Sequence, residues 1–323
     1  MDPQLELAII NYLICKGFTN FGNTCFYNAV LQALMKCIGL MDILKNYQGD
    51  NKLLKYLRIT IHDYYLKPNV ETIGPVLLLR SYKEMNSLYH GGTQDDAHEC
   101  LGFFLDHFNM SAEKEAINIK HLFDCNLVSR LKCTKCSYES EMNVLEKLIT
   151  LPIMPADRSK LYDNFNDALA DFLSEEILTD DNQLACEKCN SSINENKNIT
   201  RDESSPKEII KVDAKKSLLI KGSPTYLFIG LKRFINEWDK EKGCIKTTKF
   251  NHDVFMPDSI IINQVVYTMK GSIHHMGGLH GGHYVYYHKY GDTWTLFNDD
   301  DITPGRTEEQ IVKRGYVYLY EKA

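Results

Sequence analysis

The chain has 323 residues, which is long enough to bury a large core in one or two domains. Its hydrophobic content of 44% and charged content of 25% are those of a globular protein, and they exclude a collagen-like or disordered chain. Acidic residues outnumber basic ones by 43 to 37, and the net charge of -6 argues against nucleic acid as a partner, because phosphate binding requires a basic face.

The amino terminus and the cysteines indicate the compartment. Residues 1–17 begin with an acidic residue, and their apolar run is too short and too interrupted for a signal peptide or a membrane span. We therefore expect an intracellular protein, cytoplasmic or nuclear, that has no membrane partner. Ten cysteines would indicate disulfides in a small secreted domain, but in a long chain without an export signal, metal-binding or catalytic roles come first.

The first 125 residues are predicted to be helical. One helix is expected immediately after Cys25, because Asn23 and Thr24 are residue types that cap a helix N-terminus. The clearest helix spans residues 95–108, where apolar residues recur at steps of three and four and would form one buried face. These residues are Ala97, Cys100, Leu101, Phe104, Leu105 and Phe108.

The rest of the chain is predicted to be mostly β. Residues 122–152 show short alternating runs with β-branched residues, as strands do. A helix is expected around residues 163–173, and the polar stretch that follows, up to residue 215, is typical of exposed loops. After Pro224, strand patterns return in YLFIGLKRF, SIIINQVVYTM, GHYVYYHKY, TWTLFN and GYVYLYE. Helices followed by strands predict an α+β protein.

Two Cys-x-x-Cys pairs stand out, Cys133 with Cys136 and Cys186 with Cys189. Two such pairs are the ligand set of a tetrahedral zinc site, since the two-residue gap lets a tight turn present both sulfurs to one ion. A redox role for each pair is the alternative, but two independent redox centres in polar, β-rich sequence are disfavoured. The sequence therefore predicts a structural zinc site with four cysteine ligands.

Cys25 stands at the start of a predicted helix. The unpaired N–H groups and the dipole of a helix N-terminus favour a thiolate, so they would lower a thiol pKa whose ordinary value is about 8.5. A buried core cysteine is the alternative interpretation. As a nucleophile, Cys25 would need a base nearby.

The candidate bases lie late in the chain, where six of the eleven histidines fall between residues 252 and 288. His283 heads a predicted strand, and the glycines at 281 and 282 would let the backbone pass close to a bound substrate, or simply form a tight turn. His280 and His283 could instead be a metal pair, although no acidic or cysteine ligand lies close enough in sequence to complete it.

A third group usually fixes the imidazole ring of such a pair, and Asn298 and Asp299 follow the next predicted strand. If residues alternate along a strand, only one of the two can face the histidine. Electrostatics favours Asp299, whose charge would stabilise the imidazolium, while an amide can also hold the ring by accepting a hydrogen bond. A solvated acidic turn is the remaining interpretation, and the residues alone leave the choice open.

Taken together, these segments resemble the ubiquitin-specific protease family of deubiquitinating enzymes, from about Lys16 to Glu321. GFTNFGNTCFYNAVLQAL is similar to the family's cysteine box, GTQDDAHECLGFFL to its acidic helix and GLHGGHYVYYHKYGDTWTLFNDDDI to its histidine box. The resemblance implies an α+β, papain-like cysteine protease fold in a single catalytic domain over residues 1–323. That domain would consist of a helical thumb at about 16–121, zinc-binding β fingers at 122–222 and a β palm at 223–321.

The resemblance also implies an activity and a role for each site residue. The enzyme would be a thiol-dependent deubiquitinase that hydrolyses the (iso)peptide bond after the C-terminal glycine of ubiquitin through a cysteine thioester. Cys25 would be the nucleophile, His283 the base, Asn298 the third member of the triad and Asn20 the oxyanion donor. Zinc would be a structural cofactor, ubiquitin and ubiquitinated proteins the partners, and the family leaves room for an activating protein partner.

Asp96 and Glu99 match acidic positions that meet the basic C-terminal tail of ubiquitin in such enzymes. The chain departs from the family pattern at four positions that touch no reacting group, so they bear on substrate preference. These are Phe26, Tyr27, Cys100 and Gly230. Three other functions compete: a different papain-like thiol enzyme such as an acyltransferase, an inactive ubiquitin-binding scaffold, and a zinc-ribbon nucleic-acid binder.

Overall fold

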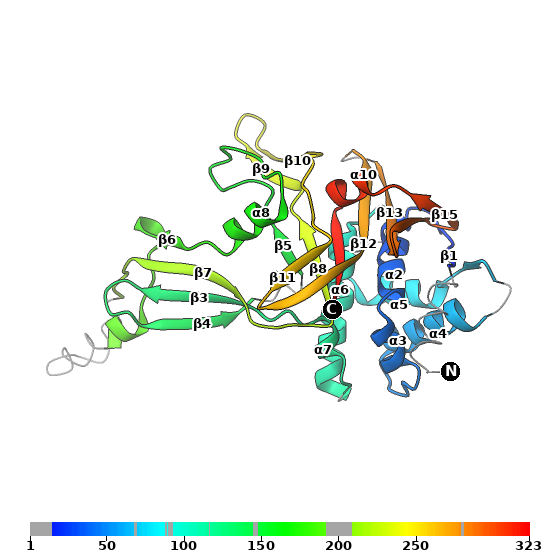
Figure 1. Ribbon diagram of the computed structural model, residues 1–323. Coiled ribbons are helices and arrows are strands. Elements are labelled where there is room, and N and C mark those ends of the chain that lie inside the picture. The colour runs from blue at the N-terminus through cyan, green and yellow to red at the C-terminus, as the bar shows by residue number, and fades with distance from the viewer. Residues whose placement is uncertain are drawn as a thin grey trace.

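The computed structural model describes residues 15–323 except 68–69, 88, 90–92, 116, 145–147, 192–208 and 279–280. Helices gather at one side of the molecule, a four-stranded sheet projects from the opposite side, and an eight-stranded sheet lies between them (Figure 1). The predicted α+β class is confirmed, and the three parts correspond to the expected thumb, fingers and palm.

The thumb holds six described helices: α2 (Cys25–Met35), α3 (Ile38–Leu44), α4 (Lys52–Leu66), α5 (Val76–Met85), α6 (Ala97–Glu115) and α7 (Lys120–Phe123). The predicted helix at residues 95–108 is confirmed as the first part of α6, and all six residues of its expected apolar face are buried. The helix predicted after Cys25 is also confirmed, because α2 begins at that residue.

The palm is an eight-stranded sheet in the order β15-β14-β13-β12-β16-β8-β5, with β11 paired to β12. Its pairs are antiparallel except for β5 with β8. Its strands are β5 (Ile149–Leu151), β8 (Tyr226–Leu231), β11 (Ser259–Ile262), β12 (Val265–Gly277), β13 (Gly282–Tyr290), β14 (Thr293–Asn298), β15 (Asp301–Arg306) and β16 (Val317–Lys322). The C-terminal strand β16 lies in the interior of the sheet.

The fingers are a four-stranded antiparallel sheet in the order β4-β3-β7-β6. Its strands are β3 (Leu127–Cys133), β4 (Glu139–Asn143), β6 (Glu176–Leu178) and β7 (Ala214–Ile220). The smaller elements are β1 (Gly17–Phe18), β2 (Thr72–Ile73), α8 (Phe165–Phe172), the 3-10 turn Asp180–Asn182, β9 (Phe234–Asp239), β10 (Cys244–Lys249) and α10 (Glu308–Arg314).

Four of the five strand segments predicted after Pro224 coincide with one strand each, whereas SIIINQVVYTM is a hairpin in which Asn263 and Gln264, both with positive φ, join β11 to β12. The β9–β10 hairpin and β15 were not predicted. The helix expected around residues 163–173 is α8. Much of the predicted loop stretch, residues 192–208, lies outside the described residues. The proposed boundaries of thumb, fingers and palm stay a prediction, and β5 of the palm sheet falls inside the range assigned to the fingers.

The core fixes α2 between the thumb helices and the palm sheet. All eleven residues of α2 are buried, and its aromatic rings Phe26 and Tyr27 pack against Tyr82 and Phe104. Burying a large apolar side chain contributes roughly 1.5–3 kcal/mol. The N-terminus of α2 is therefore held firmly against strand β13.

Within the described residues, no single helix has both the length and the apolar composition needed to cross a membrane. Helices α2 and α3, which meet at a bend of 83°, have the required length and apolar composition only when they are counted as one span.

Candidate active site and metal centre

Cys25 is the first residue of α2, and only 1% of its surface is exposed. Its sulfur lies beside the backbone of β13, where the N–H of Tyr284 hydrogen-bonds to it. Tyr284 directly follows His283, so the fold brings the two predicted reacting residues to neighbouring positions. Both residues are described, yet no hydrogen bond joins the Cys25 thiol to the His283 ring.

The local electrostatics of Cys25 differ from the sequence prediction. Burial raises the pKa of the Cys25 thiol and the Asp299 carboxylate raises it further, while hydrogen bonds from backbone N–H groups, chiefly that of Tyr284, lower it. The expected lowering by the helix N-terminus is therefore outweighed by desolvation in the free protein. Thr24 occupies the N-cap position as predicted, but its side chain makes no capping hydrogen bond and instead joins the preceding loop.

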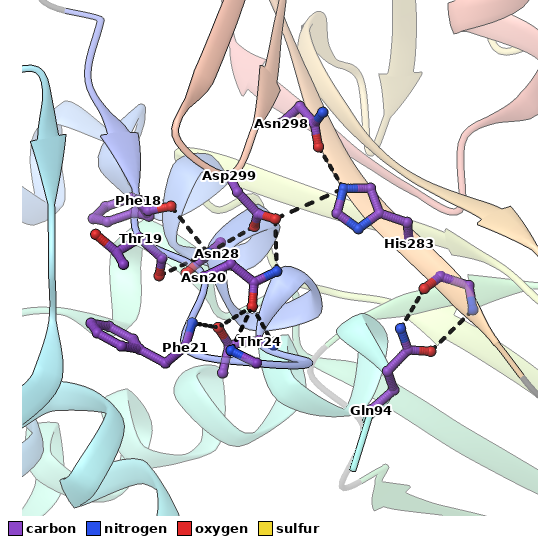
Figure 2. A network of polar contacts seen from close by, with 12 residues as sticks. Phe18, Thr19, Asn20, Phe21, Thr24, Asn28, Gln94, His283, Asn298 and Asp299 are labelled. Atoms are coloured by element: carbon purple, nitrogen blue, oxygen red, sulfur yellow. Dashed lines mark hydrogen bonds and ion pairs between the residues drawn. The ribbon is translucent and has the colours of Figure 1, made fainter. Parts of the chain in front are cut away.

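The ring of His283 contacts both candidates for the third group (Figure 2). Its Nε2 lies 2.5 Å from Asn298 Oδ1 and 3.9 Å from Asp299 Oδ2. Asn298 is the last residue of β14, and Asp299 then turns the chain with a positive φ of 53°. That turn ends the alternation of the strand, so both side chains point to the same histidine, contrary to the expectation that only one could.

Asn20 is fixed by four hydrogen bonds at the entrance to α2. Its Oδ1 accepts from the N–H of Gly22, the N–H of Thr24 and the Thr24 hydroxyl, at 3.0, 3.2 and 3.2 Å. Its Nδ2 therefore faces the other way and donates to Asp299 Oδ2 at 2.8 Å. An amide NH2 carries two hydrogens, so one donor of Asn20 is used by Asp299.

Two residues of this network were missed by sequence reasoning, although both lie in the quoted motifs. Asn28 on α2 donates to Asp299 Oδ1 at 2.8 Å, so the Asp299 carboxylate accepts from two amides. Gln94 bonds the backbone of Gly282 twice, because its Oε1 accepts from the Gly282 N–H and its Nε2 donates to the Gly282 carbonyl (Figure 2). Gln94 thus ties the thumb to the residue that precedes His283.

Gly282 is required by close packing inside the palm. A Cβ at this position would lie 2.0 Å from the Nε2 atom of His275, whose ring packs on Tyr284 with centroids 4.6 Å apart. Burial lowers the pKa of His275 to about 4, so its ring is neutral at physiological pH. The sequence suggests that Gly281 and Gly282 give room for a substrate. At Gly282, close packing against His275 is an alternative reason for the glycine.

Asp96 and Glu99 open α6 but have different surroundings. The Asp96 carboxylate accepts hydrogen bonds from the hydroxyls of Tyr284 and Tyr316, at 3.2 and 2.8 Å, and from backbone N–H groups of the first helical turn. Glu99 is exposed. Both line a cavity of about 600 Å³ between thumb, palm and fingers, and Lys232 and Arg233 line it as well. We call it the Glu99 cavity.

One departure from the family pattern has a clear structural partner. A Cβ at Gly230 would lie 2.8 Å from the ring of His98, which hydrogen-bonds the Thr150 hydroxyl at 2.7 Å. The glycine therefore makes room for His98 in the wall of the same cavity.

The four cysteines of the two Cys-x-x-Cys pairs converge at the tip of the fingers. Their sulfurs all lie within 4.8 Å of one another, with Cys133 to Cys189 at 3.8 Å and Cys136 to Cys186 at 3.6 Å. Four sulfurs about 2.3 Å from one zinc ion in a tetrahedron would lie about 3.8 Å apart. The cluster can therefore hold a single metal ion, and its geometry disfavours two separate redox pairs.

The backbone between Cys133 and Ser137 forms a tight turn. Cys133 ends β3, and its sulfur accepts the N–H of Cys136 at 3.5 Å. Ser137 follows with a positive φ of 55°, which closes the tight turn. His280, which would form the alternative metal pair with His283, lies outside the described residues.

A family model described as ubiquitin carboxyl-terminal hydrolase matches residues 16–320. The chain belongs to this family. The match covers the thumb, fingers and palm, and it includes every predicted site residue. Membership confirms the family resemblance drawn from the cysteine, acidic and histidine segments.

Curated ubiquitin carboxyl-terminal hydrolases support the assignment. The chain is 28% identical to "Ubiquitin carboxyl-terminal hydrolase Usp2" of Drosophila melanogaster over 95% of its own length and 34% of that protein's. It is 24% identical to "Ubiquitin carboxyl-terminal hydrolase 4" of Arabidopsis thaliana, over 94% of this chain and 92% of that protein. The chain thus spans about a third of the length of the Drosophila relative.

Solved structures of this hydrolase family show the same fold. One is the SAGA deubiquitinating module of Ubp8, Sgf11, Sus1 and Sgf73 bound to monoubiquitin, with a TM-score of 0.72 and 22% identity. The similarity covers 96% of this chain and 69% of that chain. The same module bound to ubiquitin aldehyde gives a TM-score of 0.70 at 21% identity. These similarities confirm the predicted fold with thumb, fingers and palm.

Proposed function

We propose that this chain is a thiol-dependent deubiquitinase, which hydrolyses the (iso)peptide bond after the C-terminal glycine of ubiquitin. The observation that carries the proposal is the meeting of Cys25, at a buried helix N-terminus, with the strand of His283, whose Nε2 is held by Asn298. Membership of the ubiquitin carboxyl-terminal hydrolase family supports the choice of substrate.

In the proposed reaction the Cys25 sulfur attacks the carbonyl carbon of the terminal glycine and passes its proton to the Nδ1 atom of His283. A carbon–sulfur bond forms, and the tetrahedral oxyanion accepts the free N–H of Asn20. His283 then gives the proton to the leaving lysine amine as the carbon–nitrogen bond breaks. Water, deprotonated by the same ring, hydrolyses the thioester and returns Cys25 to a thiol.

The free protein needs one adjustment before this chemistry. No hydrogen bond joins Cys25 to His283, and burial raises the pKa of the thiol. The ring has to approach the sulfur, and such catalytic hydrogen bonds often tighten only when substrate binds. Ubiquitin or an activating protein partner would supply this shift; the solved module of Ubp8 contains Sgf11, Sus1 and Sgf73 as companion chains.

The metal of the fingers is proposed to be zinc. Four thiolates at these separations suit its tetrahedral preference, and a closed set of four protein ligands is typical of a structural site. The ion would hold the β3–β4 turn to the segment that carries Cys186 and Cys189. It takes no part in the reaction.

The Glu99 cavity is proposed to receive the basic tail of ubiquitin. Glu99 is the exposed carboxylate in its wall, whereas Asp96 is largely engaged in holding Tyr284 and Tyr316. Glu99 is therefore the better test of tail binding, and Asp96 is assigned a second role as a support for β13 and β16.

The function is tested with ubiquitin that carries an electrophile at its C-terminus. A competent thiol site should gain the mass of one ubiquitin, and this adduct should vanish in Cys25→Ala. Cys244→Ser removes an exposed thiol outside the site and should react like the parent. An adduct that persists in Cys25→Ala, or no adduct with the parent, would reject the proposal.

Substitution of Glu99 should weaken substrate binding with little effect on the chemical step. Partial burial of its carboxyl group raises the pKa of Glu99, and the carboxylates of Asp96 and Asp95 add to this. Glu99→Gln should raise KM about five- to tenfold at neutral pH and leave kcat nearly unchanged, the pattern of lost uniform binding. The same charge change at Glu113, at the far end of α6, is the control.

The pH dependence of KM gives a second readout of Glu99. A raised pKa means that Glu99 loses its charge at a higher pH than an ordinary glutamate. The KM of the parent should therefore rise as the pH falls toward that raised value, and the difference from Glu99→Gln should disappear there. A constant ratio of the two KM values across pH would contradict a role for the charge.

A further inference from the structure

Three large apolar side chains lie exposed beside the entrance to α2. Phe21, Val76 and Leu77 are 44%, 55% and 50% exposed. They are neighbours in space, because the Phe21 ring lies 3.3 Å from the position of a Cβ on Gly74, and the Gly74 carbonyl accepts the N–H of Val76 at 2.8 Å. We call this cluster the Phe21 surface. Exposed apolar side chains that gather at one place on a surface are a feature of binding sites.

The Phe21 surface lies next to the proposed chemistry. Phe21 directly follows Asn20, the proposed oxyanion donor, and its backbone N–H bonds the Thr24 hydroxyl at 3.0 Å, one residue before Cys25. In Figure 2 the Phe21 ring points away from His283 and from Gln94. The side chain is therefore directed out of the site rather than into it.

The order of the palm strands shows on which side of His283 this surface lies. β13 carries His283 and lies between β14 and β12. The Glu99 cavity lies toward β12, β16 and β8, where Phe234 packs on His275 and Tyr316.

The segment of Phe21 lies toward β14 instead. The N–H of Phe18 donates to the Asp299 carbonyl at 2.8 Å, and Asn20 bonds the Asp299 side chain, at the turn between β14 and β15. β1 pairs with β2, and β2 leads into α5, whose first residues are Val76 and Leu77. The two surfaces therefore lie on opposite sides of the histidine.

The position of the Phe21 surface indicates what binds there, and this inference rests on the proposed function. Cleavage of an isopeptide bond divides the substrate into an acyl part and an amine part, which extend in opposite directions from the reacting carbon. If the ubiquitin tail lies in the Glu99 cavity, the lysine and the protein that carries it lie on the β14 side. We infer that the Phe21 surface binds the protein that carries the leaving lysine.

The chemistry of the surface suits a folded protein rather than a flexible tail. Its apolar centre is bordered on the next turn of α5 by Arg80, whose guanidinium pairs with Glu84 at 2.8 Å. An apolar centre with a polar border is the ordinary anatomy of a protein interface. The occupant should accordingly present an apolar patch around its linked lysine.

The test compares two substrates that share ubiquitin and differ in the leaving group. One is ubiquitin linked through its terminal glycine to aminomethylcoumarin, a small amine, and the other is a panel of isopeptide-linked diubiquitins. Leu77→Asp removes apolar surface while placing an acid in the first turn of α5, where the helix dipole favours it, so the fold is retained. Leu66→Asp is the control at an exposed leucine of α4.

The expected result is a selective defect. Leu77→Asp should lower kcat/KM for the cleaved diubiquitins about tenfold, the size of a modest interface hot spot, and leave the coumarin substrate within about twofold of the parent. Leu66→Asp should leave both unchanged. Phe21→Ala should repeat the selective defect on the diubiquitins.

Several results would overturn the inference. Equal losses on both substrates would make Leu77 part of the fold or of the acyl site, and no loss on either would leave the surface without this role. A parent that cleaves the coumarin substrate but no diubiquitin would exclude a folded leaving group of this class. A parent dimer that becomes monomeric in Leu77→Asp with both activities intact would assign the surface to a second copy. A parent inactive on both would reject the proposed function itself.

Discussion

Asn20→Ala and Asp299→Ala should each lower kcat by a similar factor, about a hundred- to a thousandfold, the usual cost of losing one oxyanion donor. The two residues act as a unit, because the Asp299 carboxylate holds the Nδ2 donor of Asn20 at 2.8 Å. The three hydrogen bonds to Oδ1 still hold the amide oxygen, but without this carboxylate the Nδ2 group loses the acceptor that directs its second N–H toward the oxyanion. The double variant Asn20→Ala/Asp299→Ala should therefore be no slower than either single variant, since residues in one network are not additive.

Substitutions of Asn298 should have a smaller effect on kcat than those of Asn20 and Asp299, because Asn298 contacts His283 directly and is proposed to orient its ring. Asn298 Oδ1 lies at the ring nitrogen of His283, whereas Asp299 is 3.9 Å away and its carboxylate accepts from Asn20 and Asn28. Asn298→Ala should lower kcat about tenfold, as for a group that orients a general base, and Asn298→Asp should keep much of the activity. The measurement is single-turnover hydrolysis, with binding of ubiquitin recorded for each variant.

The exposed Asp300 provides a matched control, because Asp300→Ala removes a carboxylate from the same turn and should leave the rate unchanged. Additive losses in the Asn20/Asp299 double variant would show that Asp299 acts independently of Asn20. Loss of turnover in Asp299→Ala with no effect of Asn20→Ala or Asn298→Ala would instead make Asp299 the group that orients His283.

Removal of the metal should unfold the tip of the fingers. A structural zinc site contributes on the order of 10 kcal/mol or more to local folding. Cys133→Ser takes away a fully buried ligand of the cluster, so the purified variant should lack the one zinc per chain expected in the parent and should melt at a lower temperature. Metal content by mass spectrometry and thermal unfolding are the measurements.

Cys244→Ser is the control for this substitution, because Cys244 is an exposed thiol outside the cluster. It should keep both the metal and the melting temperature. Parent protein that contains no metal, or a Cys133→Ser variant that melts like the parent, would contradict a structural zinc site.

The long periodic elements could be predicted from the sequence for a simple reason. The apolar stripe of α6 is explained by one buried face of a helix. The apolar runs of β12, β13 and β16 are explained by their interior position in the palm sheet, where consecutive residues are buried on both faces. The β9–β10 hairpin was missed because it pairs only with itself and keeps Trp238 and Ile245 exposed, so it shows no apolar face. Such a strand pattern is indistinguishable from a loop.

The site could be predicted as a set of residues but not as a geometry. The choice between Asn298 and Asp299 assumed that side chains continue to alternate as in a strand. The strand ends at Asn298, and a positive φ at Asp299 turns both side chains toward His283. The raised pKa of Cys25 comes from burial by parts of the chain that are remote in sequence. The support from Gln94 likewise requires a contact across 188 positions.

The interior position of β16 bears on how the protein reaches its native state. Among the described strands β16 comes last in sequence, yet it pairs with β12 on one side and β8 on the other. Asn20 and Asp299 meet across 279 positions. Folds dominated by such distant contacts form slowly, because loop closure precedes any gain from the contact. During synthesis the thumb can collapse early, but Cys25 can meet His283, its proposed base, only once β16 has been synthesised and has completed the sheet.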